Sequence, residues 1–293
     1  MNQMTTQFEP SLRISTNPMS TSVHNVESSS IVPTIQVGGV GFSNVTMQQT
    51  LSMILLMIQK SHIPHHIVTG NLDHLCILEN DKEFQAAYSS ASLVLADGMP
   101  IVWISKLLRQ SNAAVLPERV AGSDLFWELG RLSQSHGLRI FLLGGQPGAA
   151  DGAKEKLQER FPNCEICGTY CPPFENFQSN EVQDEIVRRV RSASPDILMV
   201  AFGAPKQEKW ILNNKQKLGV PVSIGVGGSF EMACGIAKRA PKIMQRIGLE
   251  WAYRLIQDPA RLYDRYIRKD MPFLVNLIRK TIIELMGHSK TTR

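Results

Sequence analysis

The chain has 293 residues, of which 43% are hydrophobic, so it is long and apolar enough to bury a sizeable core. No apolar run approaches the ~20 residues of a membrane-spanning helix and the N-terminus lacks the apolar centre of a signal peptide, so we expect a cytoplasmic protein. The net charge is +5, but residues 235–293 alone hold 13 Lys and Arg against 5 Asp and Glu, which indicates a local anionic partner such as phosphates or lipid head groups, not nucleic acid.

Three of the five cysteines fall within eight residues, a spacing that would suit a metal knuckle or a disulfide. A zinc site needs about four ligands, and no His or Cys pair completes this set. We therefore expect reduced thiols and no metal site. The cysteines are Cys76, Cys164, Cys167, Cys171 and Cys234.

The predicted elements alternate between short apolar strands and longer helices. Residues 1–33 are rich in Ser, Thr, Asn and Pro and are expected to be a disordered extension. Strands are expected over 67–69, 93–95, 140–143, 197–200 and 222–226, and helices over segments such as 151–160 and 181–192. This alternation predicts an α/β fold with a mainly parallel sheet flanked by helices in residues 34–234. Residues 235–293 form a basic helical appendage, in which Pro241, Pro259 and Pro272 separate short helices.

Asp97 is the first candidate for chemistry. In open parallel sheets, ligands bind in the crevice beyond the carboxyl ends of the strands. Asp97 follows one predicted strand, and Gly98 and Pro100 predict a sharp turn that faces the carboxylate into this crevice. The alternative is a turn-forming Asp-Gly pair that caps the next helix.

A polar run follows the first of these strands. Thr69, Asn71 and Asp73 stand at alternate positions, so hydroxyl, amide and carboxylate would lie on one side and grip a sugar. An Asx-type turn that caps a helix explains the same pattern. His74 is interpreted as structural.

Other strand ends offer candidates for binding phosphate. Gly144 and Gly145 form a glycine turn whose backbone N–H groups could hold a diphosphate, although the spacing is not a dinucleotide fingerprint and a plain tight turn explains it as well. Arg119 could bind a phosphate or carboxylate bidentately, or lie on the surface. Lys206 and Gln207 occupy the first turn of a helix and would point into the crevice, unless they are solvated helix-start residues.

The chain contains no Asp-x-Asp triplet that could hold a metal against a sugar-nucleotide diphosphate. A sugar transferase with this sequence would neutralise the leaving diphosphate with Arg, Lys and backbone N–H groups, without a metal or other cofactor. In the tail, Arg261, Arg265 and Arg268 fall on one helical face. We expect one or more of Arg254, Arg261 and Arg265 to reach over the crevice.

Residues 271–286 predict an amphipathic helix. The segment is too short and too charged to span a bilayer but can lie in its interface. We expect it to dock to a membrane, and an ordinary helix that packs on the core is the alternative. Its apolar residues are Phe273, Leu274, Leu277, Ile278, Ile282 and Leu285, beside Arg279 and Lys280.

Six ordered motifs together resemble the WecG/TagA/CpsF family of bacterial glycosyltransferases over roughly residues 35–270. They are Thr-Gly-Asn-Leu-Asp-His (69–74), Ala-Asp-Gly (96–98), Arg-Val-Ala-Gly-Ser-Asp (119–124), Leu-Gly-Gly (143–145), Ala-Phe-Gly-Ala-Pro-Lys-Gln-Glu (201–208), and Lys-Arg-Ala-Pro (238–241) with Gly-Leu-Glu-Trp-Ala-Tyr-Arg (248–254). The resemblance implies a Rossmann-like core, inversion at the transferred carbon, no metal, and an appendage that helps complete the active site and touches the membrane.

The resemblance also assigns roles. It implies that Asp97 is the catalytic base, that Thr69 and Asn71 belong to the pocket beside it, and that Gln207 is a donor-side residue. Two positions depart from the family pattern: Gly70 stands where proline is frequent, and Glu231 follows Phe230 where Asp is usual.

The implied function is that of an inverting, metal-independent transferase. It would move an N-acetylmannosamine-type or glucose-type sugar from a UDP-sugar to a polyprenyl-diphosphate-linked sugar in cell-surface polysaccharide synthesis. The enzyme would be peripheral on the inner face of the cytoplasmic membrane, with homo-oligomerisation left open. Two alternatives are a dinucleotide-dependent oxidoreductase that uses the glycine turn, and a noncatalytic membrane-surface scaffold that uses the basic tail.

Overall fold

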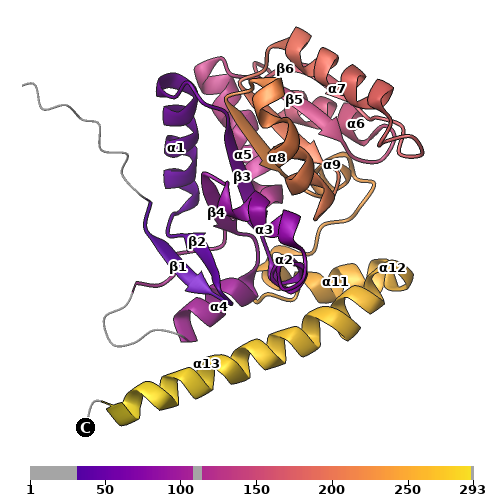
Figure 1. Ribbon diagram of the computed structural model, residues 1–293. Helices are drawn as coiled ribbons and strands as arrows, with labels where there is room; N and C mark the ends of the chain where they lie inside the picture. Colours follow the sequence, from indigo (N-terminus) through magenta and orange to yellow (C-terminus); the bar gives the residue numbers. More distant parts are fainter. Residues whose placement is uncertain (1–31, 108–113, 292–293) are drawn as a thin grey trace, which may run out of the picture. The chain divides into compact units, whose positions relative to one another are not determined.

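The structure is a computed structural model that describes residues 32–107 and 114–291, with side chains as far as residue 283. The expected disordered extension over 1–33 lies, except for its last two residues, outside this range. The described chain is built on a six-stranded parallel sheet with the strand order β4-β3-β8-β7-β5-β6 and helices on both faces (Figure 1). The predicted α/β class and the mainly parallel sheet are therefore confirmed.

Five of the six strands are the predicted apolar runs. These are β3 (His65–Gly70), β4 (Leu93–Ala96), β5 (Arg139–Gly144), β7 (Ile197–Ala201) and β8 (Val222–Gly225). The sixth, β6 (Glu165–Tyr170), was not predicted, because it is an edge strand with a polar sequence that pairs only with β5. It carries Cys167, whose thiol donates to the Ile140 carbonyl at 3.3 Å.

Alternate residues of each strand serve the two faces of the sheet. Leu142 faces α1 (Met47–Lys60), α5 (Gly122–His136), α6 (Ala149–Arg160) and α9 (Ser229–Cys234), while Phe141 and Leu143 face α7 (Asn180–Ala193) and α8 (Lys206–Leu218). Helices α6 and α7 confirm the segments predicted over 151–160 and 181–192. Because both faces are covered, the ends of the strands are left to bind ligands.

A third apolar cluster lies beside the sheet. It joins the hairpin β1 (Thr34–Val37) and β2 (Val40–Ser43) to α2 (Leu72–Leu78), α3 (Lys82–Ser89) and α4 (Met99–Leu107). The Ser43 hydroxyl accepts the backbone N–H of Val94 on β4 at 3.0 Å. Leu277 of the appendage is buried in the same cluster, so this cluster also anchors the C-terminal part of the chain.

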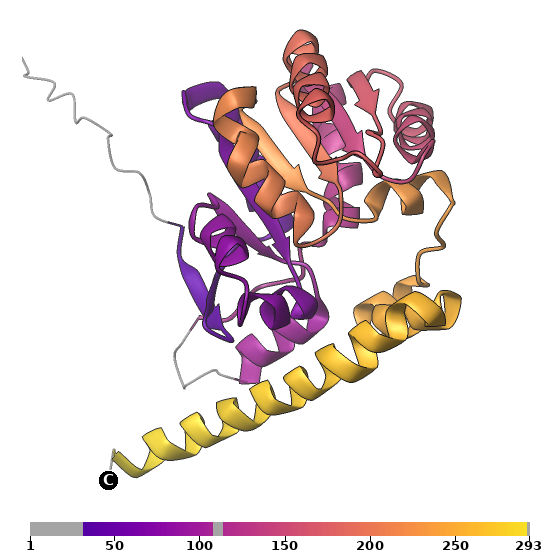
Figure 2. The same ribbon diagram turned by 45° about the vertical axis from the view of Figure 1, so that its right-hand side comes forward.

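The appendage consists of α10 (Lys242–Arg246), α11 (Glu250–Gln257), α12 (Pro259–Tyr263), a π-helical turn η1 (Asp264–Asp270) and α13 (Met271–Thr291). Pro241 and Pro259 separate short helices as predicted. Pro272 does not separate two helices, because η1 runs without a break into α13. Proline lacks a backbone N–H, and the wide turn of η1 accommodates it at the second position of α13. Helix α13 runs along the core beside α4 (Figures 1 and 2). None of the described helices is long and apolar enough to cross a bilayer.

Candidate active site

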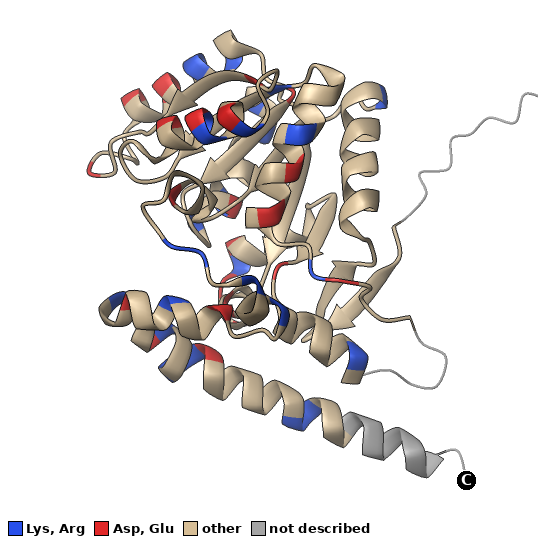
Figure 3. Cartoon of the chain, turned by 180° about the vertical axis from the view of Figure 1, so that it is seen from behind, with Lys and Arg blue, Asp and Glu red and all other residues tan. Residues whose placement is uncertain are grey.

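A cavity of about 300 Å³ lies beyond the carboxyl ends of β3, β4, β7 and β8, where the core meets the appendage. Basic segments of the appendage lie next to the core loops at this end (Figure 3). The cavity brings together eight of the eleven predicted site residues: Thr69, Asn71, Asp97, Arg119, Gln207, Arg254, Arg261 and Arg265. The other three, Gly144, Gly145 and Lys206, do not line it.

Asp97 lies between the end of β4 and the start of α4, partly accessible from the cavity. Its Oδ2 accepts the backbone N–H of Gly122, at the first turn of α5, at 3.2 Å. Burial raises the pKa of Asp97 to about 7, an effect that Glu250 reinforces and that Arg119, the Gly122 N–H and Arg254 oppose. A carboxylate with a pKa near neutrality is suited to take a proton from a hydroxyl group.

Arg119 is held between two carboxylates. Its Nη2 lies 2.8 Å from Oδ2 of Asp124 on α5, and its Nη1 lies 3.0 Å from Oε2 of Glu250 on α11. Arg239, in the segment that leads to α10, contacts the other oxygen of Asp124 at 2.7 Å. These ion pairs tie the appendage to the core. Arg119 thus makes one contact with each of two protein carboxylates and not a bidentate contact with one group, while the side chain still borders the cavity.

The polar run at the end of β3 forms the helix cap that was the alternative interpretation, and its residues also line the cavity. Asn71 caps α2, accepting the His74 N–H at 3.2 Å, and its side chain lines the cavity. Thr69 is buried and donates its hydroxyl to the Gly225 carbonyl at 2.9 Å. His74 is buried and bonded through Nδ1 to the Tyr88 hydroxyl at 2.7 Å, which agrees with a structural role.

Gln207 is fixed at the first turn of α8. Its Oε1 accepts the Gly227 N–H at 3.1 Å, and its Nε2 donates to Oε1 of Glu208 at 2.7 Å. A Cβ on Gly225 would lie only 2.6 Å from Nε2 of Gln207, so a larger residue there would displace the Gln207 amide. Burial raises the pKa of Glu208 to about 7. The amide of Gln207 therefore holds the turn after β8 against α8 at the cavity wall.

The three predicted arginines of the appendage differ in their contacts. Arg265 pairs with Asp73 of α2 at 2.9 Å, and Arg261, largely exposed, pairs with Asp258 at 2.6 Å. Arg254 forms no ion pair with any described residue, and its Nη2 lies 3.4 Å from the position of a Cβ on Gly228. Arg268 does not line the cavity with them, and its Nη1 lies 3.6 Å from Oδ1 of Asp264, four residues earlier.

The glycine turn after β5 is occupied by protein groups. The Gly145 N–H donates to the Ala201 carbonyl at 2.9 Å, and the next amide, of Gln146, donates to Oε1 of Glu231 at 2.8 Å. Gly144 has φ +96, and a Cβ there would lie 2.7 Å from the ring of Phe202. This geometry matches the plain tight turn and gives no support to a diphosphate site at Gly144 and Gly145.

Lys206 also points elsewhere. Its ammonium lies 5.7 Å and 5.2 Å from the ring centres of Phe174 and Phe177, in the segment between β6 and α7, at cation–π distance. Lys206 does begin α8, as predicted, but contacts these rings instead of the crevice.

The two departures from the family pattern have local partners. A Cβ at Gly70 would lie 2.7 Å from the Tyr88 hydroxyl, so a larger residue would displace Tyr88. Glu231 binds the Gln146 N–H and so connects α9 to the turn after β5. Both substitutions are accommodated by this chain's own neighbours.

Several residues of the site were not assigned from the sequence. Glu250 lies in a motif of the resemblance, but its partner Arg119 is 131 positions away, and only the fold reveals the pair. Asp270 is buried next to Asp73, and burial followed by Asp73 raises its pKa to about 7. In the sequence, the only sign of a special role for Asp270 is that it directly follows the basic residues Arg268 and Lys269. Among the described residues, no group of three or more His, Cys, Asp or Glu side chains is placed to hold a metal ion.

Comparisons with known proteins agree with this geometry. Residues 35–285 match the Glycosyl transferase WecG/TagA/CpsF family, and the chain belongs to this family of glycosyltransferases. It is similar to an N-acetylglucosaminyldiphosphoundecaprenol N-acetyl-beta-D-mannosaminyltransferase of Bacillus subtilis (strain 168), with 37% identity over 62% of this chain and 67% of the relative. A protein with the same name from Staphylococcus aureus (strain MW2) is 30% identical over 81% of this chain and 90% of the relative.

The raised pKa of Asp97 implies that the folded protein is less stable at alkaline pH than at acidic pH. The pKa of Asp97, about 7 in the folded chain, exceeds the ~3.9 of an unfolded aspartate, so its contribution to stability is complete below about pH 4 and is lost as pH rises through 7. Asp97→Asn imitates the protonated form. We expect its melting temperature to exceed that of the wild type at pH 8 and to match it at pH 4. A variant less stable than the wild type at pH 8 would contradict the pKa assignment.

Proposed function

We propose that the chain is an inverting, metal-independent transferase that moves a sugar from a UDP-sugar to a sugar linked to a polyprenyl diphosphate. One observation carries the proposal: a half-buried carboxyl with a pKa near 7 faces a cavity that appendage arginines line from the other side. The names of the two relatives favour an N-acetylmannosamine-type donor over a glucose-type donor, and an N-acetylglucosamine acceptor. The product would enter teichoic acid or another cell-surface polysaccharide.

The chemistry requires one base and a stabilised leaving group. The acceptor hydroxyl attacks the anomeric carbon from the face opposite UDP, and Asp97 accepts the hydroxyl proton as the new C–O bond forms. The bond from the anomeric carbon to the diphosphate breaks, and its electron pair leaves with UDP. Arg254, whose guanidinium is not paired with any described carboxylate, is best placed to stabilise this charge, helped by Arg261. Arg261 and Arg265 are each paired with a carboxylate, Asp258 and Asp73, so we expect each to contribute less than Arg254.

Neither alternative function gains support from the structure. A dinucleotide-dependent oxidoreductase would need the turn at Gly144 and Gly145 for a cofactor, and two successive amides of that turn donate to protein oxygens. A noncatalytic scaffold does not explain why the cavity holds a carboxyl whose pKa is raised to about 7, and the chain belongs to an enzyme family.

The apolar face predicted over residues 271–286 is partly covered by the core, so we propose a different membrane-docking surface. Leu277 is buried, and Phe273 and Leu274 pack on the core, as in the core-packing alternative. Leu285 lies outside the described side chains. The exposed apolar residues of the appendage are Ile236, Ile243, Ile247, Leu249, Ile256, Tyr263, Val275, Ile282 and Ile283. We propose that these, with the basic residues around them, hold the enzyme at the inner face of the membrane.

Replacing the base should remove turnover without unfolding the protein. Asp97→Asn cannot accept the proton, so we expect kcat to fall at least about a hundredfold. In the wild type, kcat/KM should rise with pH and level off above about 7, because the carboxyl must be ionised to act. Near-normal turnover of the folded variant, or a flat profile from pH 5 to pH 8, would remove Asp97 from the mechanism.

Turnover should also persist in excess EDTA. Arginine side chains and backbone N–H groups are proposed to stabilise the diphosphate, so no divalent cation is needed. The measurement compares initial rates of sugar transfer with EDTA and with added Mg²⁺ or Mn²⁺. Loss of activity in EDTA that returns with either cation would contradict a metal-independent reaction.

Membrane docking should depend on the exposed isoleucines of the appendage. Ile243 and Ile256 are 73% and 78% exposed. We expect Ile243→Ser with Ile256→Ser to weaken binding to anionic liposomes by at least about tenfold, because each buried CH₂ contributes ~0.8 kcal/mol. Ile63→Ser is the matched control, since Ile63 is 64% exposed and lies two residues before β3, at the opposite end of this strand from the cavity. Equal binding of the double variant and the control would show that docking lies elsewhere.

A further inference from the structure

A second cavity adjoins the first and is strongly basic. It is lined by Met99, Arg119, Asp124, Arg239, Lys242, Gln245 and Arg246. Four of these seven residues are cations, and Asp124, the one carboxylate, already contacts two of them. The cavity therefore has a surplus of positive charge that suits a multiply charged anion.

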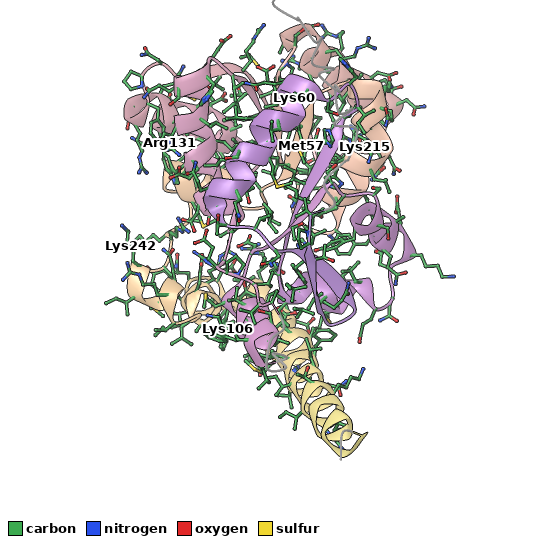
Figure 4. All side chains as sticks on the ribbon, turned by 90° about the vertical axis from the view of Figure 1, so that its left-hand side faces the viewer. Met57, Lys60, Lys106, Arg131, Lys215 and Lys242 are labelled. Atoms are coloured by element: carbon green, nitrogen blue, oxygen red, sulfur yellow. The ribbon has the colours of Figure 1, made fainter. Side chains whose placement is uncertain are left out.

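Two of its cations have no carboxylate partner among the described residues. Lys242 and Arg246 are four residues apart on α10, so they share one face of the helix and repel each other. Both are exposed, and neither pairs with a carboxylate among the residues that the structure describes. In Figure 4, Lys242 projects outward from the appendage, away from Lys60 and Lys215 at the other end of the core.

The core holds α10 firmly beside this cavity. The turn between α10 and α11 contains Gly248, with φ +66, and a Cβ there would lie 2.3 Å from the ring of Trp103 on α4. Gln245 donates to the Ala240 carbonyl at 2.6 Å, and Arg239 contacts Asp124 at 2.7 Å. The cations are thus presented by a segment that contacts α4 and α5.

The position of the cavity identifies its ligand. Met99, Arg119 and Gln245 line both cavities, and Met99 begins α4 directly after Asp97 and Gly98. An acceptor sugar whose hydroxyl reaches Asp97 carries its own diphosphate at the other end of the ring. That diphosphate must then lie beside the first cavity, where Arg254 and Arg261 are already assigned to the donor.

The outer surface of α10 suits the lipid that follows. Ile243 and Ile247 are 73% and 51% exposed and follow Lys242 and Arg246 by one residue, so the apolar pair lies next to the basic pair around the helix. A polyprenyl diphosphate has a matching arrangement, because its charged diphosphate is joined directly to a hydrocarbon chain. We propose that the second cavity binds the diphosphate of the lipid-linked acceptor through Arg239, Lys242 and Arg246. This inference rests on the proposed function.

The test is the double variant Lys242→Ala with Arg246→Ala, assayed with a water-soluble short-chain prenyl diphosphate that carries N-acetylglucosamine. We expect KM for this acceptor to rise about tenfold or more, because two charge-assisted contacts are lost. KM for the UDP-sugar and its hydrolysis without acceptor should stay within about twofold of the wild type. The matched control is Arg268→Ala with Lys269→Ala, which removes two cations of the appendage that line neither cavity and should change neither KM.

Binding measurements keep the test independent of activity. Calorimetric titration with the same acceptor should show weaker binding to the double variant than to the wild type, and the wild type should prefer the diphosphate over a monophosphate analogue. Unchanged acceptor binding would overturn the proposal. The proposal would also be overturned if the double variant lost affinity only for phosphatidylglycerol vesicles. That result would assign the cavity to lipid head groups. If the wild type transfers no sugar from any UDP-sugar, the proposed function fails, while the titration still decides the diphosphate site.

Discussion

The site depends on one interaction, the guanidinium of Arg119 held between Asp124 of the core and Glu250 of the appendage. Without it, the appendage would keep only its other contacts with the core, such as Arg239 with Asp124 and Arg265 with Asp73, and the cavity wall would lose its connection to Glu250. The same ion pairs set the charge around Asp97, because Arg119 lowers the pKa of that carboxyl and Glu250 raises it. The position of the appendage and the proton affinity of the base are therefore coupled through a single side chain.

Burial of carboxyl groups is the second constraint. Asp97, Glu208 and Asp270 each have a pKa raised to about 7, with burial as the main cause. Removing a carboxylate from water costs stability unless opposite charge or hydrogen bonds replace the solvent. Asp97 keeps one backbone hydrogen bond and remains accessible from the cavity. Removal of the Asp97 carboxyl from water thus has two effects: it lowers the stability of the fold, and it raises the affinity of the carboxylate for a hydroxyl proton.

The sequence predicted the strands and the location of the site better than it predicted the contacts between side chains. Apolar runs located five strands, and polar residues at their ends located Thr69, Asn71 and Asp97, because parallel strands deliver their carboxyl ends to one edge. Contacts between distant segments leave no such pattern: the partners of Arg119, the rings beneath Lys206 and the Glu231 carboxylate that occupies the glycine turn all depend on the fold. Helix α13 is another example, because an apolar stripe on a helix can pack against a membrane or against a protein core, and the sequence does not distinguish the two.

The most direct test of the central claim is a crystal structure with UDP and the short-chain diphosphate acceptor bound together. We expect the acceptor hydroxyl within about 3 Å of an Asp97 oxygen, on the side of the site opposite the UDP diphosphate, with that diphosphate against Arg254. An acceptor hydroxyl that contacts a different carboxylate, with Asp97 turned toward UDP or toward solvent, would contradict the assignment of Asp97 as the base.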